Sequence, residues 1–170
     1  MYNAGGIKRI WYEFYENWFF DIFNGVDTYS RLSLDKYNLD SYELDGAYQY
    51  MPSYKSTIKN SLKYIKNIYP EIINGFFLDV GCGKGKAIII ASQEGFKFGI
   101  GCEINESLIK IGNSNLKKKQ IYSRFQIKKF DVLYKDNIPN FDVCYFYNPF
   151  SKNKTKIFFK NINEVFKDKR

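Results

Sequence analysis

Three short segments of the chain combine glycines and carboxylates in a pattern that suits a nucleoside carrying an ammonium group. The first is Asp79-Val80-Gly81-Cys82-Gly83-Lys84-Gly85, which follows an apolar run and has the spacing GxGxG. Glycines at this spacing let the backbone turn tightly and approach a ligand, because they carry no Cβ atom. A carboxylate two residues before the first glycine would repel a pyrophosphate, whereas it suits a ligand with an ammonium group.

The other two segments each place one carboxylate at the end of a predicted strand. Glu103 ends a strand some twenty residues after the glycines, where a carboxylate can accept from both hydroxyls of a ribose. Asp131 follows a third predicted strand, and its carboxylate could accept from the exocyclic amine of adenine. Each segment alone has an ordinary structural explanation, but their order along the chain favours a single ligand site.

Alternating strands and helices are expected to bring these segments to one edge of a sheet. Apolar runs predict strands at 76–80, 96–102, 125–129 and 141–147, with helices at 87–91, 104–111 and 155–166. This alternation predicts right-handed βαβ units and a mainly parallel sheet, hence an α/β fold that binds ligands at the carboxyl ends of its strands. A β-hairpin turning on the glycines competes with the helix at 87–91, because three consecutive isoleucines favour a strand.

A helical extension is predicted before the sheet. Apolar side chains recur there at helical spacing, namely Trp11, Phe14, Tyr15, Trp18 and Ile22. Residues 10–23 should therefore form an amphipathic helix that ends near Asn24-Gly25 and packs through its aromatic face. Residues 26–52 are expected to be an irregular lid or connection, followed by a helix that stops before Pro70. The chain thus divides into an N-terminal helix and lid region (1–52) and a ligand-binding domain (53–170).

Composition excludes several kinds of chemistry. The 170 residues include no histidine, which excludes Ser-His and Cys-His dyads and every site that needs a histidine ligand. Cys82, Cys102 and Cys144 form no CxxC pair, which suggests reduced thiols in a cytoplasmic protein. No signal peptide is recognisable, and no apolar run approaches the roughly 20 residues that span a bilayer. A cytoplasmic protein with no metal and no membrane contact is expected.

The charge of the chain is positive and unevenly distributed. The formal net charge is +8, although residues 1–50 alone contain 4 basic and 8 acidic side chains. The remaining residues are therefore strongly basic and could attract nucleic acid or another polyanion. Alternatively, the lysines only keep an aromatic-rich protein in solution.

The segment 77–86, F-L-D-V-G-C-G-K-G-K, resembles motif I of the class I S-adenosylmethionine-dependent methyltransferases. The resemblance implies a Rossmann-like three-layer sandwich and S-adenosyl-L-methionine as cofactor. The cofactor-binding residues that it implies are Asp79, Gly81, Cys82, Gly83, Gly85, Glu103, Ile104, Asp131 and Val132. Cys82 and Cys102 are interpreted as small core residues rather than nucleophiles.

Three further elements resemble a bacterial group of small class I methyltransferases. They are Gly25-Val26-Asp27-Thr28 (G-V-D-T), Tyr50-Met51-Pro52-Ser53 (Y-x-P-[TS]) and Asn148-Pro149-Phe150 (N-P-F). N-P-F is similar to the N-P-P-Y of amino methyltransferases, which suggests a nitrogen acceptor, although the second proline is missing here. The resemblance places Asn148, Pro149, Phe150 and Tyr50 at the reactive end of the site. The structural alternative for N-P-F is a strand-ending turn with a packed Phe150.

Members of the family continue past the last predicted helix with further strands, so the resemblance predicts that this chain lacks the C-terminal strands. The strand at 141–147 would then have an unpaired apolar edge, through which a homodimer could form.

The leading hypothesis is methyl transfer to an unidentified acceptor, which could be a protein, a small molecule or nucleic acid. One alternative is a catalytically inactive or truncated module that binds S-adenosylmethionine or S-adenosylhomocysteine and acts through a basic surface. Another is an NAD-linked oxidoreductase, which the GxGxG spacing and Asp79 disfavour.

Overall fold

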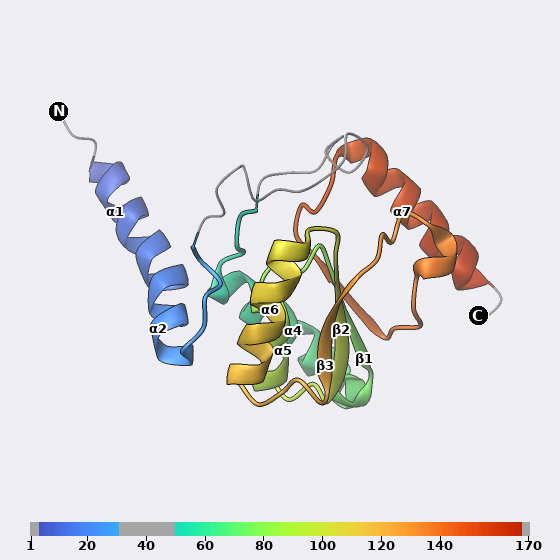
Figure 1. Cartoon of the computed structure of the whole chain (residues 1–170), viewed down its shortest axis with the longest axis horizontal. Coiled ribbons are helices and arrows are strands. Elements are labelled where there is room, and N and C mark those ends of the chain that lie inside the picture. The colour runs from blue at the N-terminus through green and yellow to red at the C-terminus, as the bar shows by residue number, and fades with distance from the viewer. Residues whose placement is uncertain (1–3, 31–49, 168–170) are drawn as a thin grey trace.

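A sheet of four parallel strands lies at the centre of the computed structural model, which describes residues 4–30 and 50–167 (Figure 1). The strands are β1 (Phe76–Val80), β2 (Phe98–Glu103), β3 (Phe125–Lys129) and β4 (Val143–Phe146), in the spatial order β3-β2-β1-β4. The central strand β1 places Asp79 opposite Gly101 of β2 and Tyr145 of β4. Because all the pairs are parallel, the carboxyl ends of the strands meet at one edge, as the sequence predicts.

Helices cover both faces of the sheet and complete a three-layer α/β sandwich. They are α4 (Lys55–Ile68), α5 (Lys86–Gln93), α6 (Glu106–Lys118) and α7 (Lys152–Val165). Alternate residues of β1 point into two separate cores, since Phe77 packs with α4 and α5 whereas Leu78 packs with Phe158 of α7. In Figure 1, α4, α5 and α6 lie on one side of the strands and α7 lies on the other. The predicted Rossmann-like fold class is confirmed.

The segment after the glycines is helical, so the β-hairpin alternative is wrong. Helix α5 starts after Gly85, and Ile88, Ile89 and Ile90 are all at most 2% exposed. β-Branched residues are weak helix formers, but a helix buried on all sides gains more from packing than it loses in propensity. The crossover that this helix provides is what allows β1 and β2 to run parallel.

Helix bounds differ from the predicted ones at both ends, and the largest difference is that α6 (Glu106–Lys118) continues past the predicted end at residue 111. Helix α6 begins at Glu106, because the side chain of Asn105 accepts from the N–H of Leu108 and so caps the helix. Ile104 therefore precedes the helix rather than belonging to its apolar face. Helix α7 begins at Lys152, three residues before the predicted start. Helix α4 ends at Ile68, two residues before Pro70, as expected.

The N-terminal helix is continuous, but its predicted packing face is wrong. It consists of α1 (Ala4–Glu13), the π-helical turn η1 (Phe14–Phe19) and α2 (Phe20–Asn24), and it ends at Gly25 with φ +63°, as predicted. Trp11 is 65% exposed and Tyr15 59%, whereas Glu16 and Asn17 are buried. The face that packs on the sheet domain carries polar groups instead, because α4 and α5 supply their partners: Glu16 accepts from the N–H of Ser56, and Asn17 accepts from Nζ of Lys86.

The fourth strand is shorter and less buried than predicted. β4 covers Val143–Phe146, all four residues of which are only half-buried, because the strand lies at the edge of the sheet. Within residues 4–30 and 50–167, no further strand pairs with β4. A homodimer formed through this edge stays a prediction.

Most of the predicted lid, residues 31–49, lies outside the described residues. None of the helices in the described ranges is long and apolar enough to cross a bilayer.

Candidate functional site

A cleft of about 160 Å³ opens at the carboxyl edge of the sheet. Most of the residues predicted to bind a cofactor or to lie at a reactive end line this one cleft: Tyr50, Gly81, Cys82, Glu103, Ile104, Asp131, Val132, Asn148, Pro149 and Phe150. Asp79, Gly83 and Gly85 do not line it. The cleft also contains residues that the sequence did not single out, among them Lys86, Asn105 and Lys154.

The three glycines of the motif adopt left-handed backbone conformations, with φ of +65° at Gly81, +52° at Gly83 and +81° at Gly85. They also permit close contacts within the protein. A Cβ atom at Gly81 would lie 2.4 Å from Cβ of Pro149, and one at Gly83 would lie 2.3 Å from Cε2 of Tyr50. The glycine turn therefore brings the N-P-F and Y-x-P-[TS] segments together, a role that the sequence interpretation, which considered only a ligand, missed.

The carboxylate of Glu103 is already engaged by backbone N–H groups. Oε1 accepts from the N–H groups of Ile104 and Asn105 at 2.8 and 3.0 Å, and Oε2 accepts from the N–H of Gly83 at 3.0 Å. Burial raises the pKa of Glu103, and these three hydrogen bonds partly oppose that effect. Since a carboxylate offers about four acceptor positions, one on Oε2 is left for a ligand. The geometry thus fits one ribose hydroxyl rather than the expected two.

Asp79 lies behind the glycine turn as a second buried carboxylate and is 3% exposed. Burial, followed by the negative charge of Glu103, raises its pKa well above the usual value. Within the described ranges, no hydrogen bond to its oxygens offsets these effects. Two buried carboxylates in such proximity favour a cationic group nearby, because a positive charge would compensate both.

Asp131 and Val132 line the far wall of the cleft after β3. Oδ1 of Asp131 accepts from the N–H of Leu133 at 2.8 Å, which fixes the orientation of the carboxylate. Val132 is 3% exposed and packs in the core below α7. The arrangement presents a fixed acceptor beside an apolar surface, as binding of a flat heteroaromatic ring requires.

The N-P-F segment forms the opposite wall. Asn148 has φ +48°, which is uncommon for a residue other than glycine and is often found at functional sites. Phe150 is half-buried and packs edge-on against Phe158 of α7, with ring centroids 5.7 Å apart. This packing agrees with the structural alternative for Phe150, although its side chain also lines the cleft.

The cysteines at the site are poor nucleophiles. Cys82 and Cys102 are 7% and 2% exposed, and burial raises the pKa of each thiol well above its usual value. Both thiols stay protonated at neutral pH, which agrees with their interpretation as core residues. The described part of the chain also contains no cluster of three or more acidic or cysteine side chains that could hold a metal ion.

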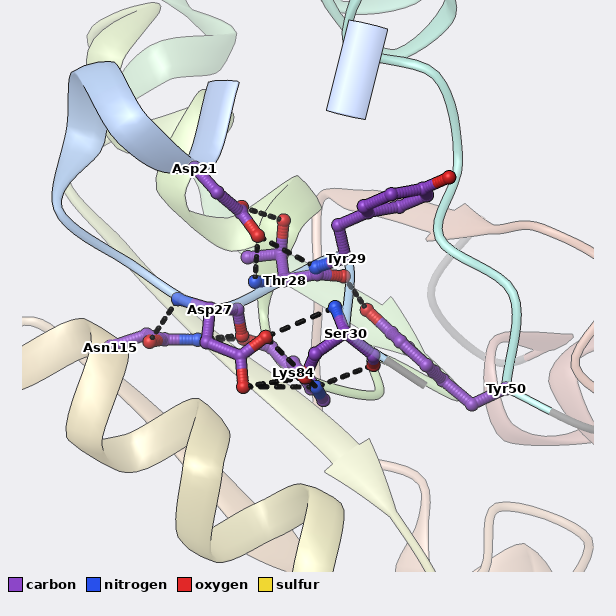
Figure 2. Close-up of polar contacts among 8 residues, drawn as sticks. All are labelled: Asp21, Asp27, Thr28, Tyr29, Ser30, Tyr50, Lys84 and Asn115. Atoms are coloured by element: carbon purple, nitrogen blue, oxygen red, sulfur yellow. Dashed lines mark hydrogen bonds and ion pairs between the residues drawn. The ribbon is translucent and has the colours of Figure 1, made fainter. Parts of the chain in front are cut away.

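Two buried lysines connect the glycine turn to the N-terminal extension. Nζ of Lys84 donates to the carboxylate of Asp27 and to the carbonyl of Ser30 (Figure 2). Nζ of Lys86 donates to the carbonyl of Glu16 at 2.9 Å and to Oδ1 of Asn17 at 2.6 Å, so the π-helical turn supplies its acceptors. Burial lowers the pKa of Lys86 to about 8, although the carboxylates of Asp21 and Glu16 oppose this shift.

Glu16 caps the start of α4, since the N-cap residue of that helix provides no side-chain hydrogen bond. Oε2 of Glu16 accepts from the N–H of Ser56 in the first turn of α4 at 2.7 Å. A carboxylate at this end of a helix also interacts favourably with the helix dipole. The buried polar face of the N-terminal helix is therefore matched to polar groups on the sheet domain.

The sequence matches no protein-family model and no curated protein. The fold, in contrast, is similar to solved structures. PH1948 from Pyrococcus horikoshii, named as an RNA methyltransferase, has a TM-score of 0.59 and 16% identity, over 85% of this chain and 67% of that chain. The methyltransferase domain of bacterial CtHen1 has a TM-score of 0.51 and 16% identity, over 63% of this chain and 60% of that one. The chain has a Rossmann-like fold, as these structures do.

A third neighbour, the PH0226 protein from Pyrococcus horikoshii OT3, has a TM-score of 0.52 and 20% identity, over 65% of this chain and 52% of that one. The chain therefore spans about two thirds or less of the length of these three structures. At such identities the similarity concerns the fold alone.

The cleft lies where open, mainly parallel α/β sheets usually bind their ligands. Strands β2 and β3 continue the sheet on one side of β1, and β4 returns on the other side, so the strand order reverses at β1. Where the strand order reverses, the connections that follow the two neighbouring strands lead away in opposite directions, and a crevice opens between them. Gly81, at the end of β1, meets Pro149, which follows β4, at this position.

Proposed function

We propose that the cleft binds S-adenosyl-L-methionine and that the chain transfers its methyl group to an acceptor, with a nitrogen atom as the preferred site. The observation that supports this proposal most directly is that Asp79, Glu103 and Asp131 gather at one edge of the sheet, beside the cleft that Asn148 and Phe150 also line. The alternative module that binds the cofactor without turnover shares this site, so only a transfer assay separates the two.

The residues present fit the groups of this cofactor. Asp79 is a buried carboxylate beside the cleft, whose ionised form a bound ammonium group would favour, and Oε2 of Glu103 retains one acceptor position for a ribose hydroxyl. Asp131 and Val132 would hold the adenine ring. When bound, S-adenosylmethionine supplies a methyl group on a sulfonium, which needs no further activation by a metal. The role left for Tyr50, Asn148 and Phe150 is to align the acceptor and exclude water.

Asn105 provides an independent sign of a ligand. It is 2% exposed and lines the cleft, and its Nδ2 is buried without a hydrogen-bond partner among the described residues. A buried donor without a partner costs about 1–3 kcal/mol, which a ligand acceptor would recover. We assign this donor to the nucleoside part of the cofactor, because Asn105 lines the cleft with Glu103 and its main-chain N–H donates to that carboxylate.

Replacing Asn105 with serine tests this assignment. Serine caps α6 as well as asparagine but lacks Nδ2, so the thermal midpoint should be unchanged or higher. The affinity for S-adenosylhomocysteine, measured by calorimetric titration, should fall about tenfold. An unchanged affinity in a folded variant would mean that Nδ2 does not contact the ligand.

A phosphate-bearing acceptor such as RNA is the first class to test. The first turns of α7 are rich in lysine. Lys152, Lys154 and Lys156 add positive charge to the end of the helix where the dipole is already positive. Lys154 also lines the cleft. Residues 143–163 contain no acidic side chain to oppose them. The name of the structural neighbour PH1948 suggests the same class.

We also propose that the protein is cytoplasmic and that it forms a homodimer through the edge strand β4.

The decisive experiment combines cofactor titration with a transfer assay. S-adenosylhomocysteine should bind more tightly than NAD, and methyl-labelled S-adenosylmethionine should label RNA, with binding to RNA falling steeply as salt increases. Tighter binding of NAD would revive the oxidoreductase alternative. Binding of S-adenosylhomocysteine with no label transferred to RNA, protein or small-molecule acceptors would support the inactive module.

A further inference from the structure

Lys84, in the middle of the glycine turn, is a completely buried cation. Its residue is 0% exposed, and its Nζ lies 3.0 and 3.2 Å from the two carboxylate oxygens of Asp27 and 2.7 Å from the carbonyl oxygen of Ser30 (Figure 2). Removing an ammonium group from water is expensive unless such partners compensate it. The turn therefore depends on a segment more than fifty residues earlier in the chain.

The partners of Lys84 belong to a segment, residues 27–30, that is fixed from several sides. The main-chain N–H of Asp27 donates to Oδ1 of Asn115 at 3.0 Å, and Nδ2 of Asn115 donates to the carbonyl of Asp27 at 2.8 Å. Oδ2 of Asp21 accepts from the N–H groups of Thr28 and Tyr29. Burial raises the pKa of Asp27, but hydrogen bonds from Ser30 and Lys84 outweigh this and lower it overall, so its carboxylate is ionised at neutral pH.

This segment in turn fixes Tyr50. The hydroxyl of Tyr50 donates to the carbonyl of Thr28 at 2.6 Å, and burial raises its pKa well above the usual value, so it remains a donor. Its ring lies against Gly83, where a Cβ atom would approach Cε2 to 2.3 Å, and 5.6 Å from Nζ of Lys84. Tyr50 lines the cleft, whereas Lys84 does not.

We propose that Lys84 is a positioning residue of the cofactor site: it anchors residues 27–30 so that the Thr28 carbonyl holds the Tyr50 ring as a wall of the cleft. The inference rests on the proposed function, because it concerns the affinity for S-adenosylmethionine and its product. It gives the G-V-D-T segment a defined task, since Asp27 binds Lys84 and Thr28 binds Tyr50. A residue outside the cleft thereby controls how tightly the cleft holds its ligand.

A double-mutant cycle measured by titration with S-adenosylhomocysteine tests this inference. Lys84→Met removes the ammonium group and keeps an apolar stem, and Tyr50→Phe removes only the hydroxyl. We expect each to weaken binding about fivefold to tenfold, as the loss of one buried hydrogen-bonded anchor does. The double variant should bind no more weakly than Lys84→Met alone, because the two act along one path. Lys63→Met, an exposed lysine of α4, is the matched control and should leave the affinity unchanged.

Three results would overturn the inference. The first is wild-type affinity in both single variants, and the second is full additivity in the double variant, which would show that Lys84 does not act through Tyr50. The third result is a folded wild-type protein that binds no S-adenosylhomocysteine at all. It would refute the proposed function itself, and the wild-type titration alone recognises it.

Asp27→Asn replaces Lys84→Met in the cycle if the latter variant unfolds during the titration. The side chain of Asp27 is 41% exposed, so its replacement is milder.

Discussion

Replacing Glu103 with alanine is expected to weaken binding of S-adenosylhomocysteine at least about 100-fold, which corresponds to about 2.7 kcal/mol. The variant loses the acceptor position proposed for the ribose, where a hydrogen bond to a charged group contributes about 1.5–3 kcal/mol. It also leaves the N–H groups of Gly83, Ile104 and Asn105 without their carboxylate. The glycine turn and the start of α6 should loosen together, so calorimetric titration should be accompanied by thermal unfolding.

Glu106→Ala is a suitable control for this variant. Glu106 lies three residues later in the first turn of α6, its side chain is 77% exposed, and it pairs with Lys129 at 3.2 Å. An exposed pair of this kind contributes little to stability, so both the affinity and the thermal midpoint should stay close to the wild-type values. If Glu103→Ala bound the ligand as tightly as Glu106→Ala does, the ribose would not lie at Glu103.

The Gly83→Ala variant is expected to lose both stability and ligand affinity. An alanine at φ +52° is strained by about 1–2 kcal/mol, and its Cβ would lie 2.3 and 2.7 Å from two ring carbons of Tyr50. Overpacking of this kind costs a further 1–3 kcal/mol or so, because the ring must leave its position. Since that ring lines the cleft, the affinity for S-adenosylhomocysteine should fall more than tenfold. Denaturant unfolding and titration together measure the two effects.

Gly25→Ala separates the backbone strain from the clash. Gly25 has φ +63°, close to the +52° of Gly83, but an added Cβ there meets nothing within 4 Å. It should therefore lose only the part of the stability that is due to strain, about 1–2 kcal/mol, and bind the ligand normally. Equal losses in the two variants would show that contact with Tyr50 plays no part at Gly83.

The sequence by itself determined the central architecture and the elements that carry the site. The runs ending at Val80, Glu103 and Lys129 were recognisable as strands, and their alternation with helices predicts right-handed units in a parallel sheet, although the strand order came only from the structure. The sequence therefore predicted that the carboxylates at the ends of these strands lie at one edge of the sheet. Strands, helices and the residues that end them depend on local patterns, which can be read directly from a sequence.

Tertiary structure alone decided the contacts that give these residues their roles. The pair Lys84–Asp27 joins residues 57 positions apart, and the bond from Lys86 to Asn17 joins residues 69 apart. No periodicity encodes such pairings, so Lys84 could be seen only as the variable position of a glycine motif. The π-helical turn likewise buried Glu16 rather than the aromatic stripe, because partners on α4 and α5 favoured polar groups there. Burial of polar side chains is settled by which partners the fold brings within reach, and this is known only once the chain is folded.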